Sequence, residues 1–577
     1  MAVETGVPEI EKGAVTHHEE TPVSTPQEHS LSAGDAKMTA KTWFVIFILS
    51  STFGLSFWPV PTTAAMQSTL GAEWAAPNAT YWFIPAFTTA CALGFLLAGS
   101  HSDLFGRRLF LLFGNAMCCV GFLVIGTAKG PTQFTAGLAI TGFGAGFCQM
   151  SMCSIPELMP NKYRHIGITI SDGFVFLIVV IGPVVGRYAN DAGEGAWRAI
   201  YYAGFGAQFV SLAGIACFYF PPKHPKGVPW GEGLRGLDYV GAFLIVSGTC
   251  ISLVGIINTT FLKSSDVKVV APLAVGLGLV AIFGVWETLS NVKYKLCPPE
   301  IFRVNYGREF TAPFILAFIV TMYYYFINIA YPTMVSVFYI TPTTSRSEVL
   351  LLTLPPNLGL VFGSMLLISF GAVIKRWRTT LTVAWTGMMV FGSLMALVTP
   401  YNRGLMIALT FLQQTFFGWA QYESVMFTQL GVHQHDLGTS GGLAGASRFA
   451  GGSIAQAIYT TILTNAQSKR AAQTLPAAAI AAGLSSENAA KLLAAFPLGA
   501  KAIAAVPGVN ANIIAAASTA FQWSYAHGLK IMILSSLAWG GLGLILCLLT
   551  TDASKKMNSE INVYLENDVN KEKNEFH

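Results

Sequence analysis

The chain has 577 residues, of which 53% are hydrophobic and only 11% are charged. A soluble protein of this length needs roughly a quarter of charged residues to solvate its surface, so much of this surface must face lipid. The net charge is only +5, which argues against a nucleic-acid partner, because such a partner requires a concentrated basic face. The nine cysteines lie mostly in apolar stretches without the spacing of metal ligands, and we expect them to be small buried hydrophobic residues.

Both ends of the chain are polar. Residues 1–41 show no positively charged start followed by an apolar core, so we expect no cleaved signal peptide. Their composition predicts a disordered cytosolic tail. Residues 552–577 have the same character, and we expect a second cytosolic tail there.

Between these tails, apolar and polar stretches alternate along the chain. A helix needs about 20 apolar residues to cross roughly 30 Å of hydrocarbon, and only helices satisfy their backbone in lipid at this segment length. The pattern therefore predicts an all-α membrane protein with 14 transmembrane helices. The expected spans lie near residues 42–62, 80–99, 109–127, 132–153, 168–188, 199–220, 239–258, 268–288, 310–334, 349–373, 379–399, 404–427, 438–463 and 527–550.

The segment 464–526 is Ala-rich but only weakly apolar. It carries five charged residues and is divided by Pro476, Pro497 and Pro507. These features predict an extramembrane loop with short helices. A fifteenth span is the alternative.

Basic residues in the short loops indicate the orientation of the chain in the membrane. With the N-terminus inside, the inside loops hold 14 Lys and Arg residues and the outside loops hold seven. The two glycosylation sequons, at Asn78 and Asn258, both fall outside in this arrangement. Because the number of spans is even, both tails are then cytosolic and the loop 464–526 is outside.

The loop after the second span carries the pattern Gly99-x-x-x-Asp103-x-x-Gly106-Arg107-Arg108. This pattern resembles the signature between the second and third helices of the major facilitator superfamily of transporters. Glycine permits close approach of helices, and an aspartate can cap a helix start and pair with a guanidinium. The resemblance implies that this turn latches the two halves of the protein together in the outward-open state. The alternative is an ordinary basic cytosolic turn.

The fifth span contains Gly182-Pro183-Val184-Val185-Gly186, which resembles part of the exporter-type motif of drug antiporters. Proline bends the helix and small residues permit close packing. The match is partial, because Ile178 and Arg187 stand where that motif has glycine, and Gly-Pro also occurs for packing alone. The fourth span lacks the arginine that such antiporters carry before Gly-x-Gly, so no proton-coupling role is carried over to it.

Longer passages of the sequence indicate which family within the major facilitator superfamily the chain resembles. Residues 102–108, 144–164, 197–202 and 218–222 resemble the fungal trichothecene efflux pump family, a 14-span group related to fungal siderophore transporters. The resemblance covers roughly residues 42–463. It implies a major facilitator fold of two six-helix bundles with two inserted central helices. The expected organisation is a tail (1–41), an N-terminal bundle (42–221), a linker with two extra helices (222–296), a C-terminal bundle that includes the loop 464–526 (297–551), and a second tail (552–577).

Three ionisable residues fall inside predicted spans: Asp172, Glu423 and Arg448. Such groups cost several kcal/mol in lipid unless they face a cavity or a partner. Low dielectric favours the neutral form of a carboxylate and so brings its proton exchange towards neutral pH. We therefore expect Asp172 or Glu423 to bind a coupling proton, with Arg448 setting the local field and Gln149 adding polar surface. The alternatives are helix-end capping by Asp172 and a structural pair between Glu423 and Arg448.

Other features are weaker indicators of a site. No carboxylate lies deep in the first span, so we expect a neutral, amphipathic or chelate-type cargo. The run His433-Gln434-His435-Asp436 contains metal-ligand residue types, but without a geometric frame we expect a solvated turn, and no metal or cofactor. Several aromatic residues could line an apolar pocket or simply pack and anchor: Trp58, Tyr323, Tyr324, Tyr325, Phe416, Phe417 and Trp419.

These features together predict a secondary transporter that works by alternating access. We expect it to export a toxin, a secondary metabolite or a drug from a fungal cell, driven by protons, as a monomer in the plasma membrane or, second, in a vacuolar or vesicle membrane. Uptake of siderophore iron by the same fold is the first alternative. A membrane-embedded transferase would need a cluster of His, Asp or Glu at one membrane face. Only the run at His433 approaches such a cluster, so we expect no enzyme activity. A channel or receptor is a further alternative, which would conduct or signal without coupling to a gradient.

Overall fold

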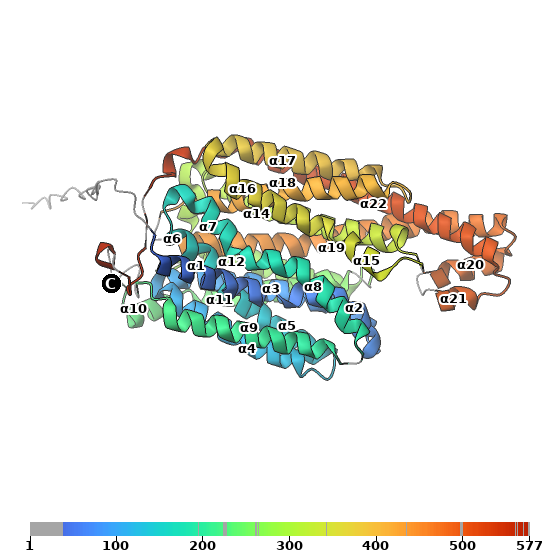
Figure 1. Cartoon of the computed structure of the whole chain (residues 1–577), viewed down its shortest axis with the longest axis horizontal. Helices are drawn as coiled ribbons and strands as arrows, with labels where there is room; N and C mark the ends of the chain where they lie inside the picture. The colour runs from blue at the N-terminus through green and yellow to red at the C-terminus, as the bar shows by residue number, and fades with distance from the viewer. Residues whose placement is uncertain are drawn as a thin grey trace, which may run out of the picture.

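The computed structural model describes residues 38–193, 195–222, 228–259, 262–263, 265–341, 343–433, 436–496, 500–559, 561, 563–568 and 571–574. Regular structure in these residues is helical, apart from one isolated pairing of Leu237 with Tyr294. The long helices run side by side along the long axis of the molecule (Figure 1). We call the end where α1 begins and the residues after α22 lie the tail face, and the opposite end the head face.

The N-terminal bundle is held together by close crossings at small residues. A Cβ on Gly142 of α5 would lie 2.8 Å from the Cα of Phe87 in α3, and one on Gly144 would lie 2.8 Å from the amide nitrogen of Cys118 in α4. In lipid, such close contact replaces the hydrophobic drive for helix association. The helices of this bundle are α1 (Ala40–Ser56), α2 (Pro59–Glu73), α3 (Phe83–Phe105), α4 (Arg107–Gly126), α5 (Pro131–Cys148), α6 (Ser151–Glu157), α7 (Arg164–Ser171), α8 (Gly173–Asp191) and α9 (Trp197–Phe218).

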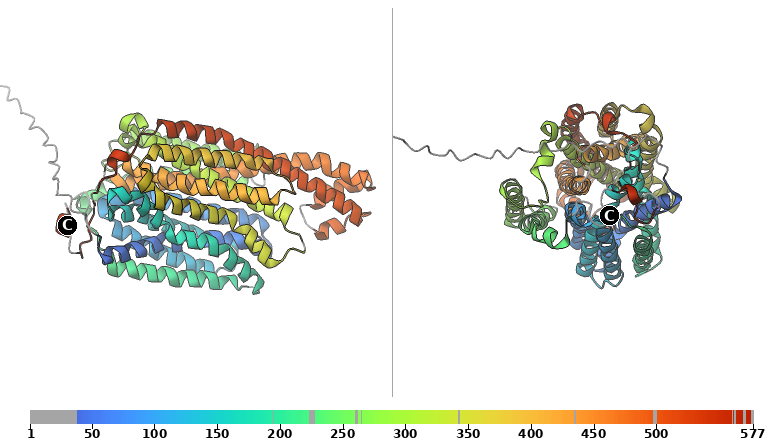
Figure 2. Two further views of the ribbon diagram at one scale, coloured as in Figure 1. Left: turned by 45° about the horizontal axis from the view of Figure 1, so that its top comes forward. Right: turned by 90° about the vertical axis from the view of Figure 1, so that its left-hand side faces the viewer.

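A central pair of helices lies beside the two bundles (Figure 2, green). Aspartates cap both, since Asp238 accepts a hydrogen bond from the amide of Gly241 at 2.8 Å and Asp266 accepts one from Lys268 at 2.9 Å. The outer side of the pair is apolar and open, with Phe243 69% exposed, as expected of a lipid-facing surface. This part consists of α10 (Trp230–Arg235), α11 (Tyr239–Asn258) and α12 (Val267–Leu289).

The C-terminal bundle contains two helices that extend beyond the others at the head face (Figures 1 and 2). With 45 residues, α19 is roughly 67 Å long, about twice the hydrocarbon thickness. Its far part, the start of α22, α20 and α21 share a small core that includes Leu475, Leu492 and Ile513. The helices are α13 (Pro299–Arg303), α14 (Thr311–Met334), α15 (Arg346–Thr353), α16 (Pro355–Ile374), α17 (Trp377–Leu394), α18 (Arg403–Leu430), α19 (Leu437–Ala481), α20 (Ser486–Ala495), α21 (Ala500–Ala504) and α22 (Ala511–Leu549).

Twelve helical segments of the described residues are long and apolar enough to cross a membrane. The sequence predicts 14, and α18 and α19 make the difference. Both are long enough, but α18 carries buried Gln413, Gln414 and Glu423, and α19 begins as a Gly- and Ser-rich helix. The polar residues lower the mean hydropathy of both helices. In the structure these side chains are buried, so they do not face lipid. The count of 14 is therefore not confirmed.

The described residues after α22 differ from the disordered tail that the sequence predicts over 552–577. They lie across the tail face, with Ala553 4% and Leu565 2% exposed. Polar composition predicted disorder here, but isolated apolar side chains are enough to dock a segment onto a preformed surface. Of the N-terminal tail predicted over 1–41, residues 1–37 lie outside the described residues.

The α3–α5 crossing gives a test of the packing. Gly142→Leu should lower the thermal midpoint in detergent, since overpacking costs typically about 1–3 kcal/mol. Gly206→Leu in α9 is the matched control, because a Cβ there meets no atom within 4 Å. Equal midpoints for the two variants would contradict the crossing.

Candidate functional site

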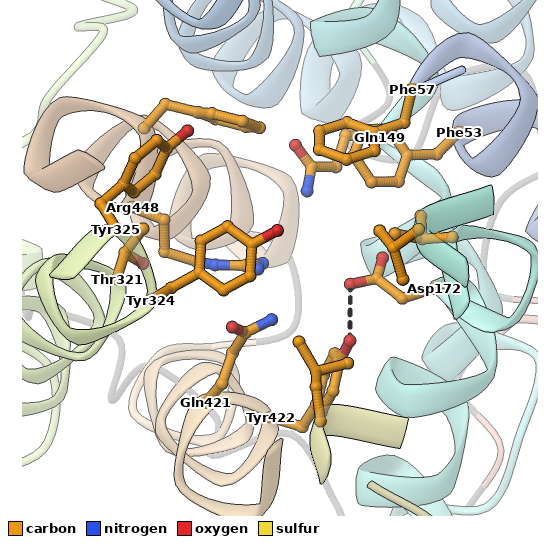
Figure 3. Close-up of a pocket in the computed structure, with 14 residues that line it drawn as sticks. Phe53, Phe57, Gln149, Asp172, Thr321, Tyr324, Tyr325, Gln421, Tyr422 and Arg448 are labelled. Atoms are coloured by element: carbon orange, nitrogen blue, oxygen red, sulfur yellow. Dashed lines mark hydrogen bonds between the residues drawn. The ribbon is translucent and has the colours of Figure 1, made fainter. Parts of the chain in front are cut away.

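A cavity of about 620 Å³, partly open to solvent, lies between the two bundles. Both bundles supply its walls, and amide, carboxyl, guanidinium and phenol groups face it alongside aromatic rings (Figure 3). The lining residues are Phe53, Phe57, Gln149, Asp172, Val175, Val179, Thr321, Tyr324, Tyr325, Leu360, Gln421, Tyr422, Arg448 and Phe449.

Asp172 lies at a break in the predicted fifth span. The chain leaves α7 after Ser171, and α8 begins at Gly173. The carboxylate is 3% exposed, and its Oδ2 accepts a hydrogen bond from the hydroxyl of Tyr422 at 3.0 Å (Figure 3). Its Oδ1 has no partner in the described part of the chain. Because Tyr422 belongs to α18, this hydrogen bond joins the N-terminal to the C-terminal bundle.

Arg448 and Gln149 face the same cavity. The guanidinium of Arg448 extends from α19 into it, and its Nη1 lies 3.8 Å from Sδ of Met152 (Figure 3). Its Nε and the Oε1 of Gln149 are buried without hydrogen-bond partners among the described residues. No ion pair between Arg448 and Asp172 occurs in that part of the chain. The cavity therefore holds an acid and a base that are not neutralised by direct contact.

Glu423 lies outside the cavity, one residue after Tyr422. Its Oε1 accepts a hydrogen bond from Oγ1 of Thr380 at 2.6 Å, and its Oε2 accepts one from Nε1 of Trp419 at 2.8 Å. The alternative of a pair with Arg448 is therefore wrong for the described structure, because the carboxylate is satisfied within the C-terminal bundle. Successive helical residues point about 100° apart, which separates Glu423 from the cavity.

Two of the seven aromatic residues singled out from the sequence line the cavity, Tyr324 and Tyr325. Trp58 and Tyr323 instead donate hydrogen bonds to the carbonyls of Ile200 and Ser536. Several of the residues that line the cavity were not predicted from the sequence. The adjacent Gln421 and Tyr422 carried a signal, since a polar cluster surrounds Glu423, but Phe53, Phe57, Thr321 and Phe449 resemble ordinary span residues.

The C-terminal end of α3 contacts the start of α19 at the tail face. Asp103, 2% exposed, accepts hydrogen bonds from the amides of Gly438 at 2.9 Å and Thr439 at 2.7 Å, and from Oγ1 of Thr439 at 2.8 Å. A carboxylate at a helix N-terminus satisfies orphan amides and complements the helix dipole. Here the carboxylate and the helix belong to different bundles, so we call this contact the interbundle cap.

The glycines of the pattern have separate roles in this contact. A Cβ on Gly99 would lie 2.7 Å from both the carbonyl oxygen of Gly438 and the Cα of Gly442, so α3 and α19 touch backbone to backbone. Gly106 has φ of 85° and ends α3 in a conformation that side chains rarely adopt.

The two arginines of the pattern diverge. Arg107 is buried, pairs with Asp103 at 3.1 Å, and makes a two-pronged contact with Glu157 of α6. Arg108 donates to the carbonyl of Ala216 at 2.7 Å and covers the ring of Phe220 at 4.0 Å. Arg107 therefore orients the carboxylate of the interbundle cap, whereas Arg108 ties α4 to the end of α9 within one bundle.

Further contacts close the tail face beneath the cavity. The amide of the Gln429 side chain donates to the carbonyl of Met152 at 2.9 Å, and Arg164 lies 3.5 Å from the carbonyl of Gln429. The ring of His165 packs against Trp377, with 4.8 Å between centroids. In each case one partner comes from each bundle, so the tail face is sealed in this structure.

The Gly182, Pro183 and Gly186 stretch of α8 packs against α2. A Cβ on Gly182 would lie 2.8 Å from Cγ of Pro61, and one on Gly186 would lie 2.9 Å from the carbonyl oxygen of Thr62. This motif lies within the N-terminal bundle, in the helix that begins directly after Asp172, and does not touch the interbundle cap.

The other candidate residues lie away from the cavity. Asn78 is exposed in the turn after α2, and the side chain of Asn258 at the end of α11 donates to the carbonyl of Lys268 at 2.7 Å. Of the His433 to Asp436 run, Gln434 and His435 lie outside the described residues. The described part of the chain holds no group of three or more metal-ligand side chains.

Two helical bundles that enclose a central polar cavity, with a sealed end and long apolar helices, define a membrane transporter of the major facilitator type. Solved structures support this fold. The proton:xylose symporter XylE has a TM-score of 0.55 at 12% identity, covering 90% of this chain and 99% of that one. The human organic anion transporter MFSD10 has a TM-score of 0.53 at 12% identity, covering 88% and 99%.

The family model of the fungal trichothecene efflux pump (TRI12) matches residues 60–575, and the chain belongs to that family. It is 38% identical to the MFS-type transporter prx5 of Penicillium rubens over 97% of this chain and 99% of that protein. It is 26% identical to the trichothecene efflux pump TRI12 of Fusarium sporotrichioides over 82% and 79%. The protein is therefore a multi-pass membrane efflux transporter of secondary metabolites or toxins, and not an enzyme; these relatives favour export over siderophore uptake.

The interbundle cap can be tested with a native thiol. Cys153 is fully buried next to Gly441 of α19, so it should react with a maleimide only when the bundles separate. Asp103→Asn should speed this alkylation at least about fivefold, because hydrogen bonds to a charged group are worth about 1.5–3 kcal/mol. The other eight cysteines are replaced by alanine for the measurement.

Asp266→Asn is the matched control, since it removes another helix-capping aspartate far from the contact between the bundles. Asp266→Asn should leave the rate of alkylation at Cys153 unchanged. If Asp103→Asn also left this rate unchanged, the interbundle cap would not hold the bundles together.

Proposed function

We propose that the protein exports an uncharged, oxygen-rich metabolite in exchange for protons, with Asp172 as the coupling carboxylate and the tail face in the cytosol. The observation that carries the proposal is the hydrogen bond between Asp172 and Tyr422, which joins the two bundles inside the cavity.

The walls of the cavity favour a compact amphipathic cargo. Three aromatic residues, Phe53, Phe57 and Phe449, offer apolar contact, while Gln149 and Gln421 offer both donors and acceptors (Figure 3). Asp172 and Arg448 together leave little net charge, so a neutral molecule with ring surface and several oxygens fits better than an ion.

Proton exchange at Asp172 provides a coupling mechanism. When ionised, the carboxylate accepts a charge-assisted hydrogen bond from Tyr422, roughly twice as strong as a neutral one. This bond favours the state in which the tail side of the cavity is closed. A proton that arrives from the head side weakens the bond and favours opening towards the tail face, where the proton leaves and cargo enters. Protons then move inwards as cargo moves outwards.

A 14-span topology is supported by the packing of α18 and α19. Both run within the C-terminal bundle, where α18 contacts α16 and α17 and α19 contacts α3, α14 and α22. Helices surrounded in this way can cross the bilayer with polar side chains, because these do not meet lipid. Together with the 12 apolar segments, they give 14 spans, with the tail face cytosolic and α20 and α21 outside. The plasma membrane is the proposed location.

Coupling is tested with purified protein in sealed vesicles. In vesicles where the protein is oriented with its tail face outwards, an acid lumen should drive accumulation of a trichothecene inside the vesicle. The trichothecene is the first probe in a panel of metabolites. Asp172→Asn should abolish this stimulation by the gradient, a loss of at least tenfold, while downhill exchange persists, because the cavity remains but the titrating group is gone.

Glu423→Gln is the matched control, because it neutralises a buried carboxylate of α18 that lies outside the cavity. It should retain the dependence on the pH gradient even where it lowers stability. Full dependence on the gradient in Asp172→Asn would rule out Asp172 as the coupling group.

A further inference from the structure

The residues that follow α22 contact both bundles at the tail face. We define the described residues 553–559, 561 and 563–568 as the strap. In Figure 1 it runs as a red trace down the left-hand end of the molecule, from the C-terminal bundle towards the N-terminal bundle. Segments that link two bundles across a sealed mouth restrict how far the mouth can open.

The first anchor of the strap lies on the C-terminal bundle. Oγ of Ser554 donates to the carbonyl of Lys375 at 2.9 Å. Nζ of Lys556 donates to the carbonyl of Leu430 at 2.9 Å and pairs with Glu309 at 2.5 Å. Burial acts to raise the pKa of Glu309, but the hydrogen bonds from Lys556 and Asn305 outweigh it and hold the pKa below its ordinary value. The pair is therefore charged at neutral pH.

The second anchor lies on the N-terminal bundle and is larger. Its polar part is mostly backbone: the amide of Lys162 donates to the carbonyl of Asn558 at 2.7 Å, and the amide of Glu566 donates to the carbonyl of Phe220 at 2.8 Å. At its end, Asp568 accepts hydrogen bonds from the hydroxyls of Thr39 at 2.8 Å and Thr42 at 3.2 Å.

The apolar part of the second anchor is Leu565. It is 2% exposed and joins a cluster of the N-terminal bundle that includes Leu158 and Tyr219. A leucine seated in a core of this kind requires a defined docking position rather than loose contact.

The strap also reaches the interbundle cap through one residue. The amide of Val563 donates to the backbone carbonyl of Glu157 at 3.1 Å. The carboxylate of Glu157 holds Arg107, which in turn pairs with Asp103. Docking of the strap therefore supports the same helix end, in α6, that orients the carboxylate of the cap.

The two anchors leave almost no slack between them. Lys556 contacts the C-terminal bundle and Asn558 contacts the N-terminal bundle. An extended chain covers at most about 3.3–3.6 Å per residue, so their Cα atoms cannot separate beyond about 7 Å. Wider separation of the bundles at the tail face must break one anchor.

We propose that the strap is a second restraint on the sealed tail face, and that its release sets how often the transporter opens towards the cytosol. This goes beyond the proposed function, because it concerns the balance between the two conformations and not the cargo or the proton. The second anchor is the one that detaches, since residues 553–557 remain joined covalently to α22 in the C-terminal bundle.

The test uses the variant that retains Cys153 alone. Truncation after Met557 removes the whole second anchor, and Leu565→Asp disrupts it without shortening the chain. Both should raise the rate of Cys153 alkylation at least about threefold. Truncation after Asp568 and Ser559→Asp are matched controls, since the first keeps both anchors and the second adds a carboxylate at an exposed position; both should react at the parental rate.

An unchanged rate in both the Met557 truncation and Leu565→Asp would overturn the proposal, as would an equal increase in the two controls. The outcome is independent of cargo identity and proton coupling, because alkylation needs neither. If the strap proposal fails, the proton-coupling role of Asp172 is still tested separately by the transport assay with Asp172→Asn.

Discussion

The buried carboxylate of Asp103 and the first amides of α19 satisfy each other's hydrogen bonding across the boundary between the two bundles. The carboxylate is 2% exposed and the amides of Gly438 and Thr439 have it as acceptor at 2.9 and 2.7 Å. Burying a charge is costly unless it is paired and hydrogen-bonded, and a helix start leaves amides unsatisfied. Each bundle thus carries one half of a polar contact. Because water can solvate both halves when they part, the net strength is modest and the contact is reversible.

The cavity owes its shape to this contact. With α3 against α19 at Gly99 and Gly442, the tail side is sealed, and the contacts of Gln429, Arg164 and His165 add to this seal. Above this seal, Asp172 and Arg448 face each other from different bundles without an ion pair. A direct pair would neutralise both groups, whereas their separation leaves one oxygen of Asp172 and the Nε of Arg448 without partners in the described residues. Under the proposed mechanism, these groups respond to a proton and to cargo.

The sequence predicts the helices well because apolar length is a local property. It singles out Asp172, Glu423 and Arg448 because charge in an apolar stretch is rare, and Asp103 because its turn resembles a known signature. Its limits follow from geometry. Nothing local shows that Asp103 caps a helix that begins 334 residues later at Leu437, or that Tyr422 and not Glu423 meets Asp172. The polar end of the chain predicts disorder, since the surface that accepts Leu565 exists only in the folded bundle. Only 12 of the 14 expected spans are apolar enough to be counted as membrane-crossing, because α18 and α19 carry buried polar side chains.

In the proposed transport cycle, the tail face closes and opens as the bundles rock against each other. Spin labels at Tyr163→Cys and Arg376→Cys, on opposite bundles, report this separation through double electron–electron resonance once the native cysteines have been replaced. Rocking of the bundles predicts two populations of distances, a short one at neutral pH and a longer one that grows on acidification and in Asp103→Asn. One unchanging distance in every condition and variant would contradict it.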